Sequence, residues 1–413
     1  MYIPRNIEKK ILNFIKSPEI IAIVGPRQSG KTTLLSHIHS RYTKTSSYVT
    51  FEDPDILSMF ENSTDDFIKM YVEDKDFLFV DEFQYAKRGG KILKQIYDTQ
   101  KIKIIITGSS SIDLTIKALK YLTGRIFVFE LFPFDFEEFL RAKNTSLWTF
   151  YTKHISKKKS FSIINSSHLP FDAEIKKKIN KYFEEFILFG GYPRVVLSKN
   201  KEEKIEVLKG IYSIFFLREV KDYLGLIEDY KLQRLIKATA LQIGNLIDYN
   251  ELGTTSGYSF ISLKKYLNFL EKSYILSLIK PFFSNRRKEI IKNPKVYFID
   301  TGLRNYISGD FRPLNSRTDS SFLLENAVFS AIKKKNIKVS YWRTKTKQEI
   351  DFIIEENKMA IEVKNRIDKC KVNISTKDFS GIYPDYRLWF CYYEGFDNKV
   401  KREKAVRIPA FCI

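Results

Sequence analysis

The chain has few cysteines and no long apolar run. Its three cysteines, Cys370, Cys391 and Cys412, follow neither a zinc-binding spacing nor a disulfide framework, which fits a reducing cytoplasm. No run of about 18 uncharged apolar residues occurs, so we expect no membrane span and no membrane partner. The first residues also lack the basic-then-apolar design of a signal peptide. These absences predict a cytoplasmic protein.

Acidic residues are the minority among the charges. The 49 acidic residues face 70 lysines and arginines, which gives a net charge of +21. Such an excess attracts polyanions, above all nucleic acid, and makes DNA a candidate partner. A lysine- and isoleucine-rich proteome would produce the same charge without that partner. The 413 residues are enough for two or three domains.

A glycine-rich stretch, GPRQSGKT, follows the apolar run at 20–24 and precedes a helical segment. Strand, glycine loop and helix in this order predict a phosphate-binding P-loop. Its backbone N–H groups and the helix N-terminus would hold the phosphates of ATP. Lys31 would reach the β- and γ-phosphates, and Thr32 would give its hydroxyl to Mg²⁺. The predicted ATP-binding residues of the loop are Gly25, Pro26, Arg27, Gln28, Ser29, Gly30, Lys31, Thr32 and Thr33.

Two carboxylates close the next strongly apolar segment, residues 76–82. A continuous apolar strand predicts burial on both faces, as in a parallel sheet, and such sheets bind ligands at the carboxyl ends of their strands. There Asp81 would hold Mg²⁺, directly or through water, and Glu82 would polarise the attacking water. An ordinary strand end with acidic residues is the alternative, which the preceding P-loop disfavours.

Two later positions are candidate sensors of the nucleotide. The strand at 103–106 ends in small hydroxyl residues, of which Ser109 suits a γ-phosphate sensor, although a helix N-cap is an equal alternative. Arg125, just before the strand at 126–131, is a candidate arginine finger for a neighbouring subunit. A surface arginine after a helix-ending glycine is the other interpretation. A finger acting between subunits predicts a homo-oligomer.

The stretches GPRQSGKTT, FLFVDEFQ, ITGSSS, LTGR and ELFPFDFEEFL resemble the AAA+ ATPases of the archaeal and bacterial "ATP-binding protein" group. Members of that group carry a C-terminal region of unknown function, and the similarity runs across most of the chain. The resemblance implies ATP hydrolysis with Mg²⁺. A GGYP element lies at the helical lid in this group, so Arg194, which follows it here, is a candidate second sensor. A helix-connecting turn is the alternative.

Residues 249–300 show the pattern of a winged helix. We expect a short helix at 249–252, a turn at 253–257, a helix at about 259–273 and two wing strands at 274–283 and 294–300. Many winged helices bind only protein, so a protein partner stays open. The predicted DNA contacts lie on the longer helix and between the strands: Ser262, Lys264, Lys265, Asn268, Arg286 and Arg287.

The last hundred residues contain an ordered set of polar positions. Asp351, Glu362 and Lys364 resemble the catalytic core of PD-(D/E)xK nucleases, with Glu325 on the preceding helix as a fourth member. Glu362 and Lys364 are two residues apart on a predicted strand and therefore share a face. The carboxylates would bind Mg²⁺, and Lys364 would orient water or neutralise charge on a phosphodiester. The motif's proline is replaced by Ile350.

Together these patterns predict an α/β chain in four parts. They are a P-loop AAA+ ATPase core (1–140), a helical lid or insertion (141–210), a helical linker and winged-helix domain (211–312) and a restriction-endonuclease-like α/β domain (313–413). The predicted function is ATP hydrolysis coupled to DNA binding and cleavage or processing. The alternative is an ATP-switched protein whose nuclease-like domain only recognises nucleic acid or a partner.

Overall fold

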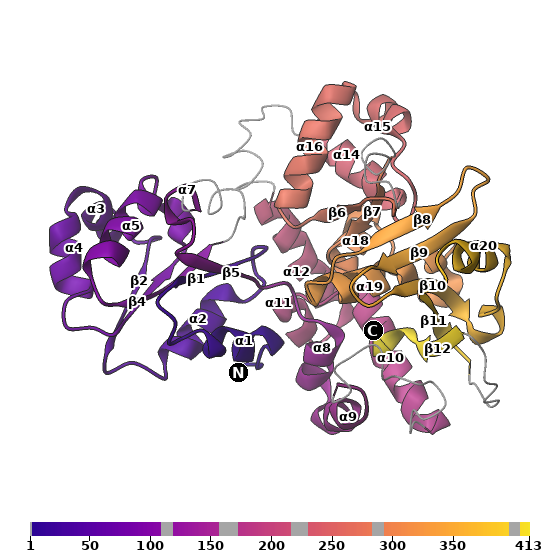
Figure 1. Ribbon diagram of the computed structural model, residues 1–413, viewed down its shortest axis with the longest axis horizontal. Coiled ribbons are helices and arrows are strands. Elements are labelled where there is room, and N and C mark those ends of the chain that lie inside the picture. The colour runs from indigo at the N-terminus through magenta and orange to yellow at the C-terminus, as the bar shows by residue number, and fades with distance from the viewer. Residues whose placement is uncertain (1, 109–118, 157–171, 216–229, 283–292, 396–404) are drawn as a thin grey trace. The chain divides into compact units, whose positions relative to one another are not determined.

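A computed structural model describes residues 2–108, 119–156, 172–215, 230–282, 293–395 and 405–413 (Figure 1). The chain forms two compact units. The first comprises Met1–Phe134 and Lys272–Tyr274, and the second Asp135–Glu271 and Ile275–Ile413. Across the described ranges, every helix is too short or too polar to cross a membrane. The finer division into four parts stays a prediction.

The first unit is built on a five-stranded parallel sheet in the order β2-β3-β4-β1-β5. A sheet of this kind is typical of a P-loop AAA+ domain. The order places β1 in the interior, between β4 and β5, so the loop after β1 opens beside the carboxyl end of β4. The strands are β1 (Ile20–Val24), β2 (Ser46–Thr50), β3 (Phe77–Asp81), β4 (Lys103–Gly108) and β5 (Ile126–Glu130).

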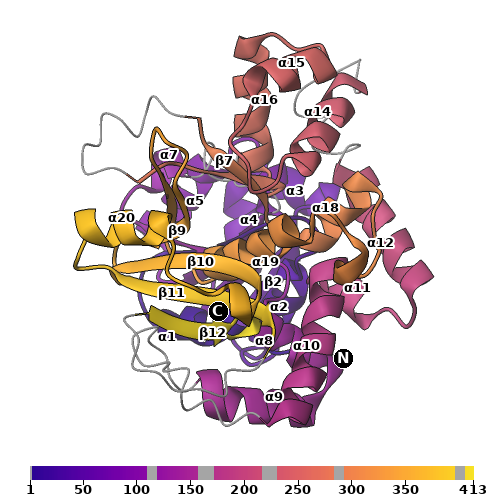
Figure 2. The ribbon, with the colours of Figure 1, turned by 90° about the vertical axis from the view of Figure 1, so that its right-hand side faces the viewer.

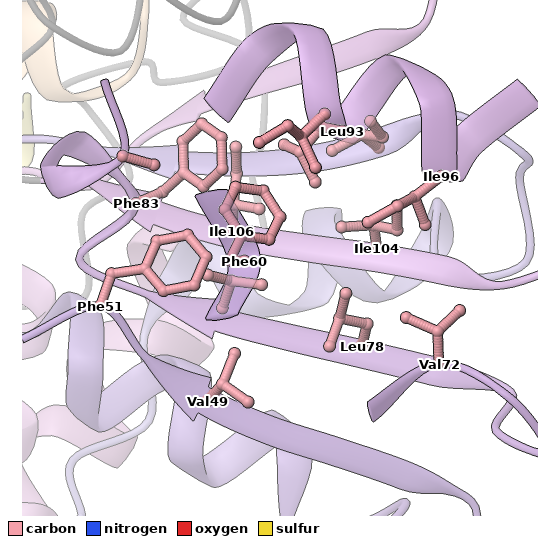
Figure 3. Close-up of a cluster of buried hydrophobic side chains, with 14 of the residues drawn as sticks. Val49, Phe51, Phe60, Val72, Leu78, Phe83, Leu93, Ile96, Ile104 and Ile106 are labelled. Atoms are coloured by element: carbon pink, nitrogen blue, oxygen red, sulfur yellow. The ribbon is translucent and has the colours of Figure 1, made fainter. Parts of the chain in front are cut away.

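Helices cover both faces of this sheet because its strands are apolar on both faces. On β4, Ile104 and Ile106 pack with Leu93 and Ile96 of α5 on one face (Figure 3), whereas Ile105 belongs to the layer on the other. Full burial of one such side chain contributes about 1.5–3 kcal/mol. The first face carries α3 (Pro54–Asn62), α4 (Thr64–Tyr71) and α5 (Gly89–Thr99), and the second carries α1 (Asn6–Asn13) and α2 (Lys31–His39). Two short elements, η1 (Phe83–Tyr85) and α7 (Leu119–Leu122), complete this unit.

The second unit begins with helices and ends with a sheet. Its central helix is α18 (Thr301–Ser308), which contacts α10, α12, α14 and α19. The helices before it are α8 (Phe136–Lys143), α9 (Thr145–Tyr151), η2 (Thr152–Ser156), α10 (Ala173–Phe189), α11 (Pro193–Leu197), α12 (Lys201–Ile214), α14 (Tyr230–Leu241), α15 (Tyr249–Ser256) and α16 (Phe260–Lys272).

The predicted GGYP element joins α10 to α11 where α18 comes very close. A Cβ at Gly190 would lie 2.0 Å from Asp300 Oδ1, and one at Gly302 would lie 2.0 Å from the carbonyl oxygen of Phe189. The buried Asp300 carboxylate accepts a 2.8 Å hydrogen bond from the N–H of Gly191. The glycines therefore have a packing role, which supports the interpretation of this element as a helix-connecting turn.

The predicted wing is a two-stranded antiparallel sheet of β6 (Leu276–Ile279) and β7 (Lys295–Phe298), directly after α15 and α16. The predicted turn at 253–257 is wrong in its extent, because α15 continues to Ser256. Asp248 caps its start by accepting from the N–H groups of two following residues, and Gly257, with φ of 73°, ends it. Gly253 therefore sits inside a helix. Arg286 and Arg287 lie outside the described residues.

A second sheet, in the order β12-β11-β10-β9-β8, completes the second unit (Figure 2). The strands β8, β9 and β10 pair antiparallel, and β10, β11 and β12 pair parallel. Helix α19 packs against β10 and β7, and α20 contacts β9. The elements are η6 (Leu314–Ser316), α19 (Ser320–Lys334), β8 (Ser340–Arg343), β9 (Glu349–Ile354), β10 (Met359–Arg366), η7 (Ile367–Lys369), α20 (Ile374–Ile382), β11 (Arg387–Glu394), β12 (Ala405–Pro409) and η8 (Ala410–Cys412). The predicted helix that carries Glu325 and the predicted strand that carries Glu362 and Lys364 are confirmed as α19 and β10.

Candidate functional site

The predicted P-loop has a backbone that its glycines make possible. A Cβ at Gly25, where φ is 155°, would lie 2.2 Å from the carbonyl oxygen of Leu131. Gly30 has φ of 96° and stands just before the first turn of α2, and Gln28 also has a positive φ of 59°. Such a turn directs successive backbone N–H groups inward, the arrangement that binds anions.

Lys31 folds back across this loop. Its Nζ donates to the carbonyl oxygens of Gly25 at 3.1 Å and of Pro26 at 2.8 Å, and its side chain is buried. Thr32 and Thr33 are exposed on the first turn of α2. The ammonium group thus lies at the loop where phosphate oxygens would enter, and the two hydroxyls border the same helix end.

Arg5 forms a hydrogen bond with the backbone of the predicted P-loop, and no motif in the sequence indicates this contact. Its guanidinium donates to the carbonyl oxygen of Ser29 at 2.8 Å and to that of Phe132 at 2.6 Å, and it lies 4.8 Å from the ring centroid of Phe134. The side chain is buried. Arg5 therefore ties the phosphate-binding loop to the segment that follows β5.

Asp81 and Glu82 stand at the carboxyl end of β3 and share one neighbour on β4, Thr107. The Thr107 hydroxyl donates to Asp81 Oδ1 and accepts a 3.1 Å hydrogen bond from the Glu82 N–H. The Tyr48 hydroxyl donates to the other Asp81 oxygen at 3.2 Å, and burial raises the pKa of Tyr48 to about 12. Both of these donors to the Asp81 carboxylate are neutral hydroxyl groups.

Glu82 has an unusual backbone. Its φ of 53° places a non-glycine residue in the left-handed region, and its carboxylate accepts from the side-chain amide of Gln84. Left-handed backbone in a bulky residue costs free energy and persists where the surroundings impose it. The left-handed backbone and the hydrogen bond from Gln84 together set the direction of the Glu82 side chain.

The candidate sensors are in different situations. Ser109 lies outside the described residues. Arg125 donates to Asp98 Oδ1 at 3.1 Å and precedes β5, at the edge of the sheet opposite to the carboxyl ends. This position lies away from the P-loop of its own chain, and both interpretations of Arg125, an arginine finger for a neighbour and a surface arginine, agree with it. Arg194 is exposed on α11.

A second cluster of polar side chains forms around β9 and β10. Backbone pairing of the two strands ends at Phe352 and Ile361. Just beyond, the Asp351 carboxylate takes the place of a strand partner by accepting from the N–H of Val363 at 2.8 Å. The two strands therefore separate at Asp351, and its side chain lies in the opening between them.

Glu362 and Lys364 share a face of β10, as predicted, and form an ion pair. Burial, together with the charge of Asp351, raises the pKa of Glu362 to about 8. Burial opposes the charge on Lys364, but the carboxylates of Glu362 and Asp351 outweigh it and raise the pKa of that ammonium. Asp351, Glu362 and Lys364 are thus close enough for their charges to interact.

Glu325 on α19 joins this cluster through contacts with β7, the second of the two predicted wing strands. It accepts from Lys295 Nζ at 3.2 Å and from the Tyr297 hydroxyl, both on β7. Burial and the charge of Asp351 raise the pKa of Glu325 to about 7. Lys295 also pairs with Glu349. In the sequence, β7 was already assigned to the predicted winged helix. The sequence therefore did not indicate that Lys295 and Tyr297 of β7 would contact Glu325.

Burial and the charge of Asp351 raise the pKa values of Glu325 and Glu362, and a nearby positive charge would relieve that repulsion. In the described part of the chain, however, no three His, Cys, Asp or Glu side chains are arranged so that they could hold a metal ion. Instead, Glu325 accepts a hydrogen bond from Lys295, and Glu362 forms an ion pair with Lys364. The structure therefore does not bring the three predicted metal ligands of this cluster, Glu325, Asp351 and Glu362, into a metal-binding arrangement.

The predicted DNA contacts on α16 lie on one side of the helix. Lys264, Lys265 and Asn268 are exposed and Ser262 is half-buried. Leu263 and other apolar residues of α16 are buried on the opposite side. The basic face is therefore open in the second unit taken by itself.

Family models cover the chain in three segments. Residues 17–140 match an AAA domain, residues 180–314 match a domain of unknown function (DUF8612), and residues 320–410 match another (DUF4143). The first segment contains the whole P-loop and all five strands of the first sheet. These matches support the P-loop unit and give no activity for the rest.

Similar proteins extend over most of the chain. An uncharacterized protein of Methanocaldococcus jannaschii is 28% identical over 404 residues, which covers 94% of this chain and 82% of that protein. Among solved structures, the ORC2 protein of Aeropyrum pernix in its ADP form is 14% identical with a TM-score of 0.31, covering 67% of this chain and 87% of that one. A STAND ATPase with a tetratricopeptide repeat sensor from Pyrococcus horikoshii is 15% identical with a TM-score of 0.28 and is covered over 46% of its length, against 81% of this chain. Structural similarity at this level supports no function.

Proposed function

We propose that this protein is an Mg²⁺-dependent ATPase that binds DNA and processes it through the carboxylate cluster of its second unit. The observation that carries the ATPase is the arrangement of Lys31 in the glycine loop with Asp81 and Glu82 at the neighbouring strand end, joined through Thr107. The match of residues 17–140 to an AAA domain supports it.

Each residue of this site has a role that its position suits. The loop N–H groups bind the phosphates, and Lys31 exchanges its two carbonyl contacts for the β- and γ-phosphate oxygens. Glu82 accepts a hydrogen bond from the water that attacks the γ-phosphorus, and ADP leaves. Thr32 and Asp81 would hold Mg²⁺, which when bound would neutralise phosphate charge. Ser109 is the proposed γ-phosphate sensor, and Arg194 remains a proposed second sensor.

Arg125 is the proposed arginine finger, which makes the active form a homo-oligomer. Its place at the amino end of β5 suits action on a neighbouring chain. ATP should therefore promote self-association, because each nucleotide is contacted by two chains. Its ion pair with Asp98 would be exchanged for the transferring phosphoryl group.

DNA is the proposed partner of the second unit. The order α15, α16, β6, β7 suits a winged helix, and the exposed Lys264 and Lys265 on α16 suit phosphate contacts. Ser262 and Asn268 on the same helix, and Arg286 and Arg287 between the wing strands, complete the proposed surface. The net charge of +21 agrees with a polyanionic partner.

The carboxylate cluster is the proposed nuclease-like site. The order of helix α19, strands β8, β9 and β10, helix α20 and strand β11 brings Asp351, Glu362 and Lys364 together. Lys364 would hold the attacking water beside the phosphodiester, or neutralise the charge that develops on it. A divalent ion bound by Asp351 and Glu362 would supply Lewis-acid chemistry.

A specific observation favours a second function for this cluster. Glu325 and Glu362 already have ammonium partners, and three-carboxylate metal geometry is missing from the residues that the structure describes. An ATP-switched protein that recognises nucleic acid or a partner without cutting it would keep such a neutralised cluster. The two functions differ in whether Asp351 and Lys364 are needed for DNA cleavage.

The deciding experiment incubates the protein with single-stranded, duplex and branched DNA, with Mg²⁺ or Mn²⁺, with and without ATP. Cutting by the wild type that is abolished in Asp351→Asn and in Lys364→Ala, but kept in the exposed control Glu356→Gln, supports the nuclease. Cutting that survives both substitutions would come from another source. Binding without cutting under every condition supports the ATP-switched binding protein.

A further inference from the structure

Gln84 ends the stretch FLFVDEFQ, two residues after Glu82. Its side chain is buried, and its amide nitrogen donates to a carboxylate oxygen of Glu82. An ionised carboxylate only accepts hydrogen bonds, so this contact fixes the amide with its nitrogen toward Glu82. A buried amide is costly to leave unpaired, and the contact therefore favours one arrangement of the two side chains.

The backbone around this pair is shaped so that the two side chains meet. Residues two apart on a regular helix do not face each other. Here Glu82 has a φ of 53° and precedes the short turn η1, in which the N–H of Tyr85 donates to the Glu82 carbonyl oxygen at 3.2 Å. The contact between Glu82 and Gln84 therefore depends on the departure from helical geometry at Glu82.

Phe83, between the two residues, anchors the turn in the core of the first unit. Its side chain is 1% exposed, and its ring centroid lies 5.8 Å from that of Phe51 and 6.3 Å from that of Phe60 (Figure 3). Gly89 leaves the space that this ring needs, because a Cβ there would lie 2.5 Å from Phe83 Cζ. The packing of the core thus fixes the backbone that carries Gln84.

We propose that Gln84 is a positioning residue for ATP hydrolysis, which keeps the Glu82 carboxylate in the orientation that receives the attacking water. This inference rests on the proposed ATPase. A glutamate side chain can turn between rotamers, and a general base works only within hydrogen-bond reach of the proton that it takes. Gln84 restricts this rotation and touches neither ATP nor the water. Its amide is neutral, so it does not itself neutralise the carboxylate.

The experiment measures kcat and KM for ATP in Gln84→Glu and Gln84→Met. Glutamate keeps the shape of glutamine but has no hydrogen to donate when it is ionised, and methionine keeps the length without a donor. Both variants should lower kcat by about 10- to 100-fold, the range for partners that orient metal ligands, with ATP affinity in calorimetry nearly unchanged. Gln95→Glu and Gln95→Met, at an exposed glutamine of the same unit, should leave both quantities unchanged.

A double variant measures whether Gln84 acts through Glu82. In the Glu82→Gln background, adding Gln84→Met should change the residual single-turnover rate by less than about twofold, because the group that Gln84 orients is already disabled. A further loss as large as in the wild-type background would mean that Gln84 acts in another way, and it would overturn the inference.

Other results separate this inference from the proposed ATPase. Wild-type kcat in a folded Gln84→Glu would overturn the role of Gln84 as a donor and leave the ATPase standing, even if Gln84→Met were slow. No hydrolysis of ATP by the wild type would overturn both. Thermal unfolding measures whether each variant folds, and Gln84→Glu decides the question where Gln84→Met does not fold, because it keeps the volume of glutamine.

Discussion

Both polar sites of this protein gather carboxylates at or beside a sheet, but their charges are satisfied in different ways. Asp81 and Glu82 in the first unit are held by the neutral side chains of Thr107, Tyr48 and Gln84. In the second unit, Glu325 and Glu362 are held by ammonium groups. The first arrangement holds the Asp81 carboxylate through neutral hydrogen-bond donors, which suits the metal–nucleotide complex that we propose there. In the second, a metal must compete with lysines already in place.

The largest expected effect separates the two sites. Lys31→Ala should abolish ATP binding or hydrolysis, because the loop loses the ammonium that reaches the β- and γ-phosphates. DNA binding without ATP, the proposed property of the second unit, should stay unchanged. Calorimetry with ATP and fluorescence anisotropy with DNA on the same preparation measure both, with the exposed Lys44→Ala as control. Full ATP affinity in Lys31→Ala would contradict the P-loop role.

A companion change tests the carboxylate beside the loop. Glu82→Gln should leave ATP bound with little turnover, because the amide no longer polarises the attacking water. A filter-binding assay and a phosphate-release assay on one sample separate the two quantities. Turnover at the wild-type rate would remove Glu82 from the reaction.

The next effect asks whether the nucleotide site is completed by a neighbouring chain. Arg125→Ala should lower ATP turnover by about 10³-fold or more, the decrease typical of an arginine finger, with ATP affinity nearly unchanged. Arg88→Ala, an exposed arginine of the same unit, is the control. Light scattering with and without ATP measures assembly. A chain that stays monomeric with ATP and hydrolyses it at an unchanged rate would contradict this role.

A smaller decrease is expected from the neutral donors that distinguish the first site. Thr107→Val removes the hydroxyl that contacts both Asp81 and the Glu82 N–H, and should lower turnover by about 10- to 100-fold, as for other supports of metal ligands. The exposed Thr99→Val should have no effect. Steady-state kinetics over a range of Mg²⁺ concentrations should show the decrease most strongly at low Mg²⁺. Unchanged kinetics would mean that the carboxylates need no such support.

The smallest expected effect concerns DNA. Lys264→Glu combined with Lys265→Glu should weaken DNA binding and reduce the salt slope by about 0.9 for each DNA phosphate that the variant no longer neutralises. ATP hydrolysis without DNA should not change. Fluorescence anisotropy at several salt concentrations measures the slope, and reversal of the exposed Lys177 and Lys181 on α10 is the matched control. Equal slopes in both double variants would remove α16 from the interface.

The P-loop could be predicted because its residues are neighbours in sequence. The turn, the lysine and the helix start all lie between Gly25 and Lys31, and local order determines their geometry. Thr107 was missed because the sensor role was assigned to a hydroxyl residue that follows it, Ser109, although Thr107 lies near the end of strand β4. Nothing local identifies Arg5, whose contact with Phe132 spans 127 residues.

The sequence predicted the residues Glu325, Asp351, Glu362 and Lys364 of the second site, but it did not predict that Lys295 pairs with Glu325. The spacing of Glu362 and Lys364 on one strand is a local signal, and the ion pair follows from it. Lys295 is 30 residues from Glu325 and lies on a strand that the sequence assigned to the predicted winged helix. No local sequence pattern therefore indicates that the two residues form a pair. Long-range pairing of charges depends on how the second sheet and the wing strand pack together.

The Lys295–Glu325 pair has a practical consequence for dividing this chain. A fragment that begins at residue 313, the start of the predicted nuclease-like domain, would include Glu325, Glu349 and Asp351 but lack the strand that neutralises them. Such a fragment would contain the buried Glu325 and the half-buried Glu349 without the lysine that pairs with both, and its folding would differ from that of the whole protein. Fragments intended to report on this site should therefore begin upstream of β6.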